Sequence, residues 1–206
     1  MQFPPVGRLT IHSLASIRNC IRVFQLEFMI GYDLEEFKEY YTTLDDLHDF
    51  FKAHGAVGPG FRELGDDERQ HIERDPSHLI VWKEKGEIIG HAIWHETTTD
   101  EMTPGDPRDN GDRERLHHLF EGPRENLVEL HEVWLKSAQR GRGYGTQFFD
   151  CFEEFASKRG FEGIVYYTDN PAAVALCRKR EYKEAREPLE EHGWFVFALQ
   201  LGSRSS

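Results

Sequence analysis

The sequence has no long apolar run and little cysteine, and each absence excludes a class of protein. No stretch of its 206 residues approaches the roughly 18 apolar residues of a membrane-spanning helix. The opening residues MQFPPVGRLTIHS lack the basic and then apolar pattern of a secretory leader. The three cysteines (Cys20, Cys151, Cys177) are odd in number and stand at no metal-ligand spacing. We therefore expect a cytoplasmic protein with free thiols, no metal and no membrane partner.

Positive charge is also scarce. The chain carries 25 Lys and Arg against 37 Asp and Glu, a formal net charge of -12. A surface of this sign repels nucleic acid and anionic membranes, and it attracts cations. The composition therefore disfavours a nucleic-acid partner and favours a cationic small molecule or a basic peptide as the binding partner.

Hydrophobic periodicity predicts alternating strands and helices. Strands are predicted over 8–14, 78–84, 87–95, 126–135, 163–168 and 192–201. Helices are predicted over 14–31, 33–55, 145–159 and from Asn170 onward, with a short polar helix or turn over 65–76. The polar segment 97–126, rich in Pro, Gly and Asp, is predicted to be an insertion loop. Residues 202–206 are predicted to form a disordered tail. The pattern favours one domain over 1–206, of α/β class, with a mixed sheet and flanking helices.

Three glycines and two arginines separate the predicted strand 126–135 from the helix that follows, in the run RGRGYG. The first amides of a helix have no intrahelical acceptor, so a bare glycine backbone there allows a phosphate to approach. The spacing fits neither a P-loop, which needs Gly-Lys-Ser/Thr, nor the G-x-G-x-x-G dinucleotide fingerprint. A pyrophosphate is still the ligand that this junction favours.

The run Arg140-Gly-Arg-Gly143-Tyr-Gly145 matches the pattern (Gln/Arg)-x-x-Gly-x-(Gly/Ala), and the chain resembles the GNAT acetyltransferase superfamily. The likeness extends to the hairpin LIVWKEKGEIIGHAIW and to the segment from Asn170 to Tyr182, and so covers more than half of the chain. It implies a mostly antiparallel central sheet with two splayed parallel strands where acetyl-CoA binds. It also implies that the chain acts as an N-acetyltransferase, and it makes a homodimer possible.

The resemblance further implies which residues bind the cosubstrate acetyl-CoA. The glycine turn would hold the pyrophosphate, the preceding strand would pair with the pantetheine arm, and the amide of Val133 would hold the oxyanion. The implied contacts are Val133, Leu135, Arg140, Gly141, Arg142, Gly143, Tyr144, Gly145, Thr146 and Asn170.

Acetyl transfer to an aliphatic amine needs a base, because the free amine has a pKa near 10 and is mostly protonated at neutral pH. Strand alternation predicts that Glu129, His131, Val133 and Leu135 share one face and that Glu132 points to the other. Glu129 and His131 match base positions of two GNAT branches. Both remain candidates for the base.

The proton donor to the leaving thiolate stays unassigned. Cys177 stands where many members of the superfamily have a Tyr, and a buried Cys is more often a small apolar residue than an acid. Tyr166, Tyr167 and Tyr182 are alternatives. The Gly-Phe that usually ends this segment is replaced by Glu181-Tyr182.

Two functional hypotheses follow. The first is an acetyl-CoA-dependent N-acetyltransferase acting on a primary amine, with acceptor contacts from segment 97–126 and from Tyr32, Asp33, Tyr40 and Tyr41. The second is an acyl-CoA-binding sensor or interaction module of the same fold without catalysis. Other eye-catching residues are interpreted as structural: His91 and His95, the pair His117-His118, and the helical stripe of Phe148, Phe149, Phe152 and Phe155.

Overall fold

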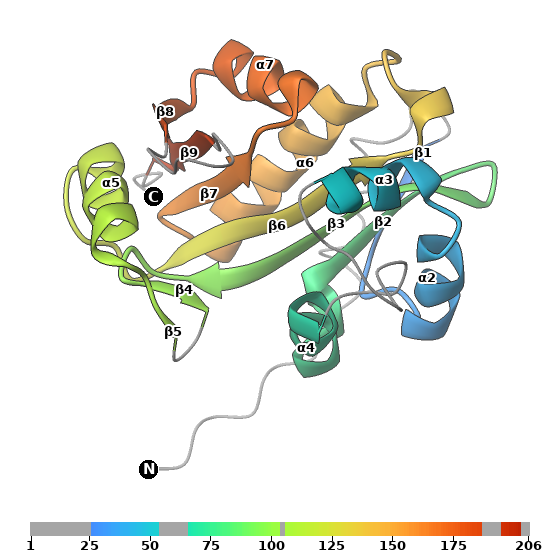
Figure 1. The fold of residues 1–206 in the computed structure, drawn as a ribbon, viewed down its shortest axis with the longest axis horizontal. Coiled ribbons are helices and arrows are strands. Elements are labelled where there is room, and N and C mark those ends of the chain that lie inside the picture. Colours follow the sequence, from blue (N-terminus) through green and yellow to red (C-terminus); the bar gives the residue numbers. More distant parts are fainter. Residues whose placement is uncertain (1–25, 54–65, 104–105, 187–194, 203–206) are drawn as a thin grey trace.

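The computed structural model describes residues 26–53, 66–103, 106–186 and 195–202 (Figure 1). The predicted strand 8–14 lies outside these residues. In chain order the elements are β1 (Leu26–Ile30), α2 (Leu34–Tyr41), α3 (Asp45–Ala53), α4 (Asp66–Arg74), a 3₁₀ turn (Pro76–His78), β2 (Leu79–Glu84), β3 (Glu87–Thr97), β4 (Glu101–Thr103), β5 (Asp106–Pro107), α5 (Asn110–Phe120), β6 (Leu127–Leu135), a second 3₁₀ turn (Ser137–Gln139), α6 (Tyr144–Arg159), β7 (Gly163–Thr168), α7 (Pro171–Lys179), β8 (Lys183–Arg186) and β9 (Phe195–Gln200).

A 7-stranded sheet in the order β1-β2-β3-β6-β7-β9-β8 forms the centre of the molecule. All neighbours in this sheet pair antiparallel except β6 and β7, which are parallel. The parallel pairing runs only from Leu127↔Gly163 to Leu130↔Tyr166, although both strands continue beyond it. The two strands therefore separate in their second half, which confirms the predicted fold class and the predicted splay.

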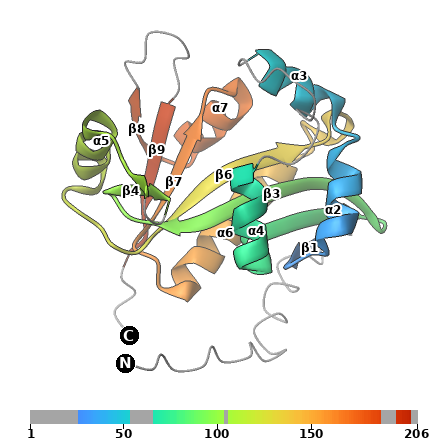
Figure 2. The ribbon, with the colours of Figure 1, turned by 60° about the horizontal axis from the view of Figure 1, so that its bottom comes forward.

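The helices cover both faces of the sheet. Helices α6 and α7 pack on one face, where Phe148 and Phe152 meet Trp82 and Trp94 in the largest apolar core. Helices α2 and α3 pack on the other face over β2 and β3. Helix α5 covers β7 and β9 on that same face, and Figures 1 and 2 show it at the opposite end of the sheet from α2. Strand β6 crosses between these two groups of helices, and Phe50 of α3 packs against Trp134 near its end.

Two predicted helices differ from the structure. Residues 26–30, predicted to end a helix, instead form β1, an edge strand paired antiparallel with β2. A short apolar run fits the periodicity of a helix and that of a strand equally well. This segment forms a strand because the outer edge of β2 offers it backbone hydrogen-bond partners. The predicted helix 33–55 is broken between α2 and α3, where the hydroxyls of Thr42 and Thr43 donate to the carbonyls of Glu39 and Tyr40 at 2.8 and 2.6 Å. Such bonds compete with continuation of the helix.

Segment 97–126 is not a structureless loop. It contains the β4–β5 hairpin and helix α5, whose N-cap Asp109 accepts a hydrogen bond from the Asp112 amide at 2.8 Å. Leu116, Leu119 and Phe120 of this helix are buried against the sheet. Their i, i+3, i+4 spacing is the signal that sequence analysis passed over. The short strand β8 was also not predicted.

Candidate active site

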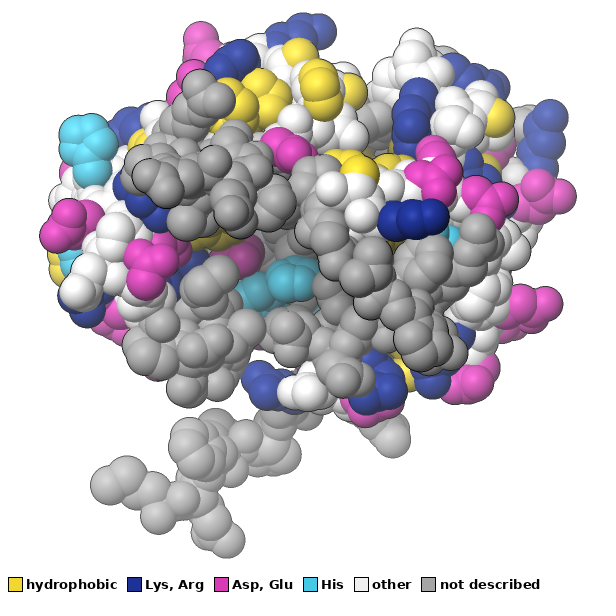
Figure 3. Space-filling model, viewed as in Figure 1, with side chains coloured by type: hydrophobic (Ala, Val, Ile, Leu, Met, Phe, Trp, Pro, Cys, Tyr) yellow, Lys and Arg dark blue, Asp and Glu magenta, His cyan; other side chains and the backbone are white. Residues whose placement is uncertain are grey.

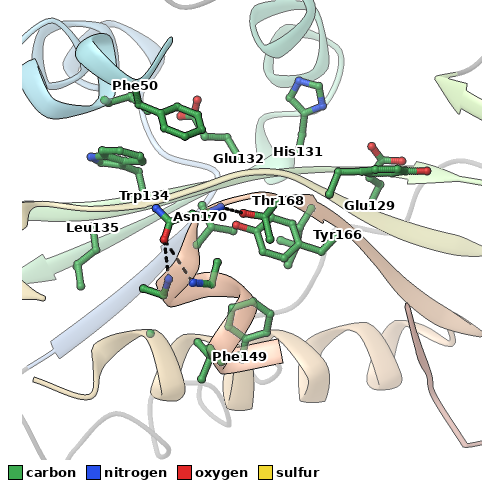
Figure 4. Close-up of a pocket in the computed structure, with 18 of the residues that line it drawn as sticks. Phe50, Glu129, His131, Glu132, Trp134, Leu135, Phe149, Tyr166, Thr168 and Asn170 are labelled. Carbon is green, nitrogen blue, oxygen red and sulfur yellow. Dashed lines mark hydrogen bonds between the residues drawn. The ribbon is translucent and has the colours of Figure 1, made fainter. Parts of the chain in front are cut away.

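A pocket of about 670 Å³ opens where β6 and β7 separate (Figure 4). Most of its lining comes from the ends of these strands, the glycine turn, the start of α7 and the inner side of α3. The lining residues are Leu47, Phe50, Phe51, Trp82, Asp109, Asp112, Glu129, Leu130, His131, Glu132, Val133, Trp134, Leu135, Arg140, Gly141, Gly145, Phe149, Tyr166, Tyr167, Thr168, Asn170, Ala172, Ala173 and Leu176.

Eight of the twelve predicted site residues line the pocket. They are Glu129, His131, Val133, Leu135, Arg140, Gly141, Gly145 and Asn170. The other four are Arg142, Gly143, Tyr144 and Thr146, which belong to the turn and the first turn of α6 next to the pocket.

A β-bulge in β6 changes the alternation of its side chains between the two halves of the pocket. The pairing of β3 with β6 shifts between Ile93↔Glu132 and Trp94↔Leu130, so His131 is the extra residue. The prediction that Glu129, His131, Val133 and Leu135 share one face is therefore wrong, because simple alternation stops at the bulge. Glu129 and Glu132 lie on the same face, together with His131, whereas Leu135 points to the opposite side (Figure 4).

The half of the pocket that faces α6 contains the residues expected to bind the cofactor. Val133 and Leu135 pack against the core on the α6 side. Asn170 caps α7, with its side-chain oxygen accepting from the amides of Ala172 and Ala173 at 3.0 and 3.4 Å. Because β7 has diverged beyond Tyr166, the β7-facing backbone edge of β6 has no strand partner there among the residues that the structure describes. An extended ligand can pair with this edge as a strand would.

The glycine turn has the backbone geometry of an anion site. Gly141 and Gly143 have φ of 75° and 84°, in the region that favours glycine, and a Cβ on either would point into open space. The first backbone hydrogen bond of α6 is donated by Gln147 to Gly143 at 3.1 Å. The amides that begin the helix therefore have no acceptor within it, and they carry the positive end of its dipole.

Both arginines of the turn are paired with carboxylates at the surface. Arg140 donates to Asp46 at 2.6 Å, and Arg142 donates to Glu84 at 3.3 Å. The Tyr144 hydroxyl also donates to Glu84, at 2.5 Å, and this bond holds the pKa of the Glu84 carboxyl below its ordinary value. Exposed pairs of this kind contribute little stability, so an anionic ligand can displace them.

The other half of the pocket lies between α3 and α5 and is lined by ionisable and aromatic side chains. Leu47, Phe50 and Phe51 of α3 form one wall, and Asp109 and Asp112 stand at the opposite end. Figure 3 shows histidine side chains at the floor of a hollow on this face. Four of the predicted acceptor contacts do not line the pocket, namely Tyr32, Asp33, Tyr40 and Tyr41. The predicted segment 97–126 does line it, through Asp109 and Asp112, and α3 provides the other wall.

Glu129 is held by a buried arginine. Arg108 donates to the Glu129 carboxylate at 2.9 Å and to Asp112 at 3.0 Å, and all three side chains are at most 5% exposed. Tyr167 donates to Asp112 at 2.8 Å. Burial raises the pKa of the Glu129 carboxyl above its ordinary value, and the charge of Arg108 opposes that rise. Sequence analysis did not identify Arg108, since nothing in a polar segment marks one arginine as buried.

Glu132 belongs to a second buried network. Its carboxylate forms a short contact with Nε2 of His91 and accepts a hydrogen bond from the Tyr41 hydroxyl at 3.2 Å. Nδ1 of His91 lies 3.3 Å from the Tyr40 hydroxyl. His91 is fully buried, in agreement with its interpretation as a structural histidine. The network ties α2 to the centre of the sheet and fixes the Glu132 side chain.

The candidates for the proton donor separate clearly. Cys177 is fully buried in the core and does not line the pocket, and burial raises the pKa of its thiol to about 12. Tyr182 does not line it either and donates to Glu153 at 3.1 Å. Tyr166 and Tyr167 do line the pocket, but the Tyr167 hydroxyl is bonded to Asp112 and Arg108. Burial raises the pKa of Tyr166, which keeps its phenol protonated.

Two further properties concern the described part of the chain. None of its helices is both long and apolar enough to cross a membrane. None of its His, Cys, Asp and Glu side chains gathers into a group of three that could hold a metal ion.

The model of the acetyltransferase (GNAT) family matches residues 36–182, and the chain belongs to this family. It is therefore an acetyltransferase by family. No curated protein matches the sequence.

Solved structures share the fold at low sequence identity. An insect arylalkylamine N-acetyltransferase 7 from Aedes aegypti, described as putative, has a TM-score of 0.62 and 11% identity, over 86% of this chain and 88% of that one. YncA from Salmonella typhimurium, a putative acetyltransferase solved with acetyl-CoA, has a TM-score of 0.55 and 18% identity, over 88% and 97%. A chain of the NatC complex bound to Gag peptide and CoA has a TM-score of 0.57 and 13% identity, over 87% and 100%.

Proposed function

We propose that the protein transfers the acetyl group of acetyl-CoA to a primary amine by direct attack. The observation that carries this proposal is the pocket in the β6–β7 splay, which has an unpaired strand edge and a glycine turn on one side and ionisable side chains on the other. The acetyl-CoA and CoA in two solved structures of the same fold support the choice of donor.

The donor would lie along β6 toward the start of α6. The backbone of Val133 and Leu135 would pair with the pantetheine arm, and the Val133 amide would donate to the thioester oxygen. The pyrophosphate would bind the backbone of the turn from Gly141 through Gly143 and the first amides of α6, from Tyr144 to Thr146. Arg140 and Arg142 would add positive charge at its rim. The Asn170 side chain, which lies in the pocket lining (Figure 4), would contact the donor.

His131 is our choice for the base. A carboxylate that accepts a hydrogen bond from a guanidinium, as Glu129 does from Arg108, is a weaker base, and Glu132 is fixed by His91 and Tyr41. His131 is half-buried, lines the pocket, and an imidazole ordinarily titrates near neutral pH. His131 would first accept a proton from the ammonium group, and the neutral amine nitrogen would then bond to the acetyl carbon. The carbon–sulfur bond would break, and the second proton of the nitrogen would pass to the departing CoA sulfur, to which Tyr166 would donate a hydrogen bond.

The acceptor would be a cationic amine. Four carboxylates line the pocket on the acceptor side, and the one guanidinium of Arg108 is bonded to two of them. The lining carboxylates are Asp109, Asp112, Glu129 and Glu132, and the chain as a whole is acidic. An ammonium group is attracted to such a site before it loses its proton. Two solved structures of the same fold are of a complex bound to a Gag peptide and of an arylalkylamine N-acetyltransferase-like protein. A peptide and an arylalkylamine each carry an amino group that can be protonated, as this site requires.

The proposal is tested by calorimetric titration with acetyl-CoA, followed by release of free thiol in the presence of a panel of primary amines. We expect binding of acetyl-CoA and thiol release with at least one cationic amine. H131Q should lower kcat by about 100-fold or more while leaving the Kd for acetyl-CoA unchanged. Binding without turnover for every amine would favour the sensor hypothesis, and absence of binding would contradict both.

A further inference from the structure

We infer that Arg108 is a positioning residue that keeps Glu129 ionised beside His131, so that segment 97–126 takes part in catalysis through Glu129. The inference rests on the proposed function and extends it to a residue outside the pocket lining. The side chain of Arg108 is 0% exposed, and it enters the site from the stretch between β5 and α5.

Every N–H of the Arg108 guanidinium has an acceptor. Nε donates to the Thr98 carbonyl at 3.1 Å, and Nη1 donates to Asp112 and to the Tyr167 hydroxyl at 3.0 and 2.9 Å. Nη2 donates to the Thr97 hydroxyl at 3.1 Å and to Glu129 at 2.9 Å. A guanidinium has five N–H groups, and these five contacts fix both its plane and its position. An arginine needed only for fold stability would not have to bond to a carboxylate in the active site, as Arg108 does to Glu129.

Several described elements bring titratable groups close to Glu129. Arg108 and Asp112 belong to segment 97–126, Tyr167 to β7, His95 to β3 at the position opposite Glu129, and His131 to β6. The rings of His95 and His131 have centroids 5.8 Å apart. One guanidinium between two carboxylates leaves a single net negative charge, which stabilises the imidazolium that forms when His131 accepts a proton.

Without the guanidinium, nothing comparable opposes the effect of burial on Glu129. The pKa of its carboxyl would then rise further, because burial favours the neutral acid. Because activity needs the ionised carboxylate, the acid side of the pH–rate profile would move to higher pH. A purely structural loss would instead lower activity equally at all pH values.

The test compares pH profiles of kcat/KM, from thiol release, for the full chain and the variants R108Q, R108K and R113Q. In R108Q we expect the acid side of the pH–rate profile, its acid limb, to move to higher pH by about one unit. Activity at acidic pH would then fall about tenfold and recover in alkaline buffer. R108K keeps the charge and should keep the limb near its normal position with a lower kcat. R113Q removes an exposed arginine of the same segment and should leave the profile unchanged.

A second measurement covers the case in which R108Q folds poorly. If Arg108 acts through Glu129, the double variant R108Q/E129Q should be no less active than E129Q alone, and removal of both charges should restore part of the lost thermal stability. Additive losses, or an acid limb that does not move in R108Q, would overturn the inference. Failure of the wild-type chain to release thiol would instead contradict the proposed function itself.

Discussion

At the scale of single residues, the site depends on which polar groups are already bonded. Glu129, His131 and Glu132 stand close together on β6, yet Glu129 is bonded to Arg108 and Glu132 to His91. These partners come from positions that are distant in sequence. A side chain's role therefore follows from its partners more than from its residue type.

The proton-donor candidates give a test with a matched pair of variants. Y166F removes a hydroxyl that lines the pocket and should lower kcat by roughly 100-fold if the phenol assists the leaving thiolate. C177A removes a fully buried thiol outside the pocket, so its expected effect is a loss of stability with kcat nearly unchanged. Steady-state kinetics and thermal unfolding of both variants separate these effects. A large loss of kcat in C177A alone would reverse the assignment.

At the scale of elements, two local irregularities build the pocket. The bulge at His131 turns the side chains of β6, and the early end of pairing between β6 and β7 opens the sheet. Helix α6 then begins at the edge of the opening, after two glycines with positive φ. Each feature interrupts a regular element, as is common where a sheet carries a functional site.

The glycine turn can be tested by comparing the two ends of α6. G143V forces a β-branched residue to a φ of 84° and should cost about 1–2 kcal/mol of unfolding free energy. Its side chain would also stand between the backbone and the pyrophosphate, so the Kd for CoA should rise by at least about tenfold. Gly160 ends the same helix at φ 83° with open space beyond its Cα. G160V should therefore cause a similar loss of stability while the Kd for CoA stays normal. Equal increases of Kd in the two variants would contradict pyrophosphate binding at the glycine turn.

At the scale of the whole molecule, helices at opposite ends of the sheet leave β6 accessible between them. Helices α2 and α3 cover β2 and β3, and α5 covers β7 and β9. The gap between them receives acidic side chains from α5 and aromatic side chains from α3. The chain carries a formal net charge of -12, so its overall field attracts cations. The expected cytoplasmic location and the possible dimer stay predictions.

The field predicts how salt affects the acceptor. Raising the salt concentration from about 0.1 M to 1 M shortens the Debye length from about 10 Å to about 3 Å. The KM of a cationic amine should then rise severalfold, and more steeply for a diamine than for a monoamine. Initial rates at saturating acetyl-CoA measure this dependence. An identical salt response for both amines would show that long-range attraction plays no part in acceptor binding.

The sequence by itself determined the family, the α/β class and the glycine turn. The spacing of the glycines lies in one short run, and the class follows from the order of strands and helices, each of which has its own local period. It also placed Glu129 and His131 on the right strand. Only the tertiary structure decided which groups they meet: the bulge shifted the faces of β6, and Arg108 reached Glu129 across 21 positions of the chain. Cross-strand register and long-range ion pairs are set by the packing of distant elements, and no local period encodes them.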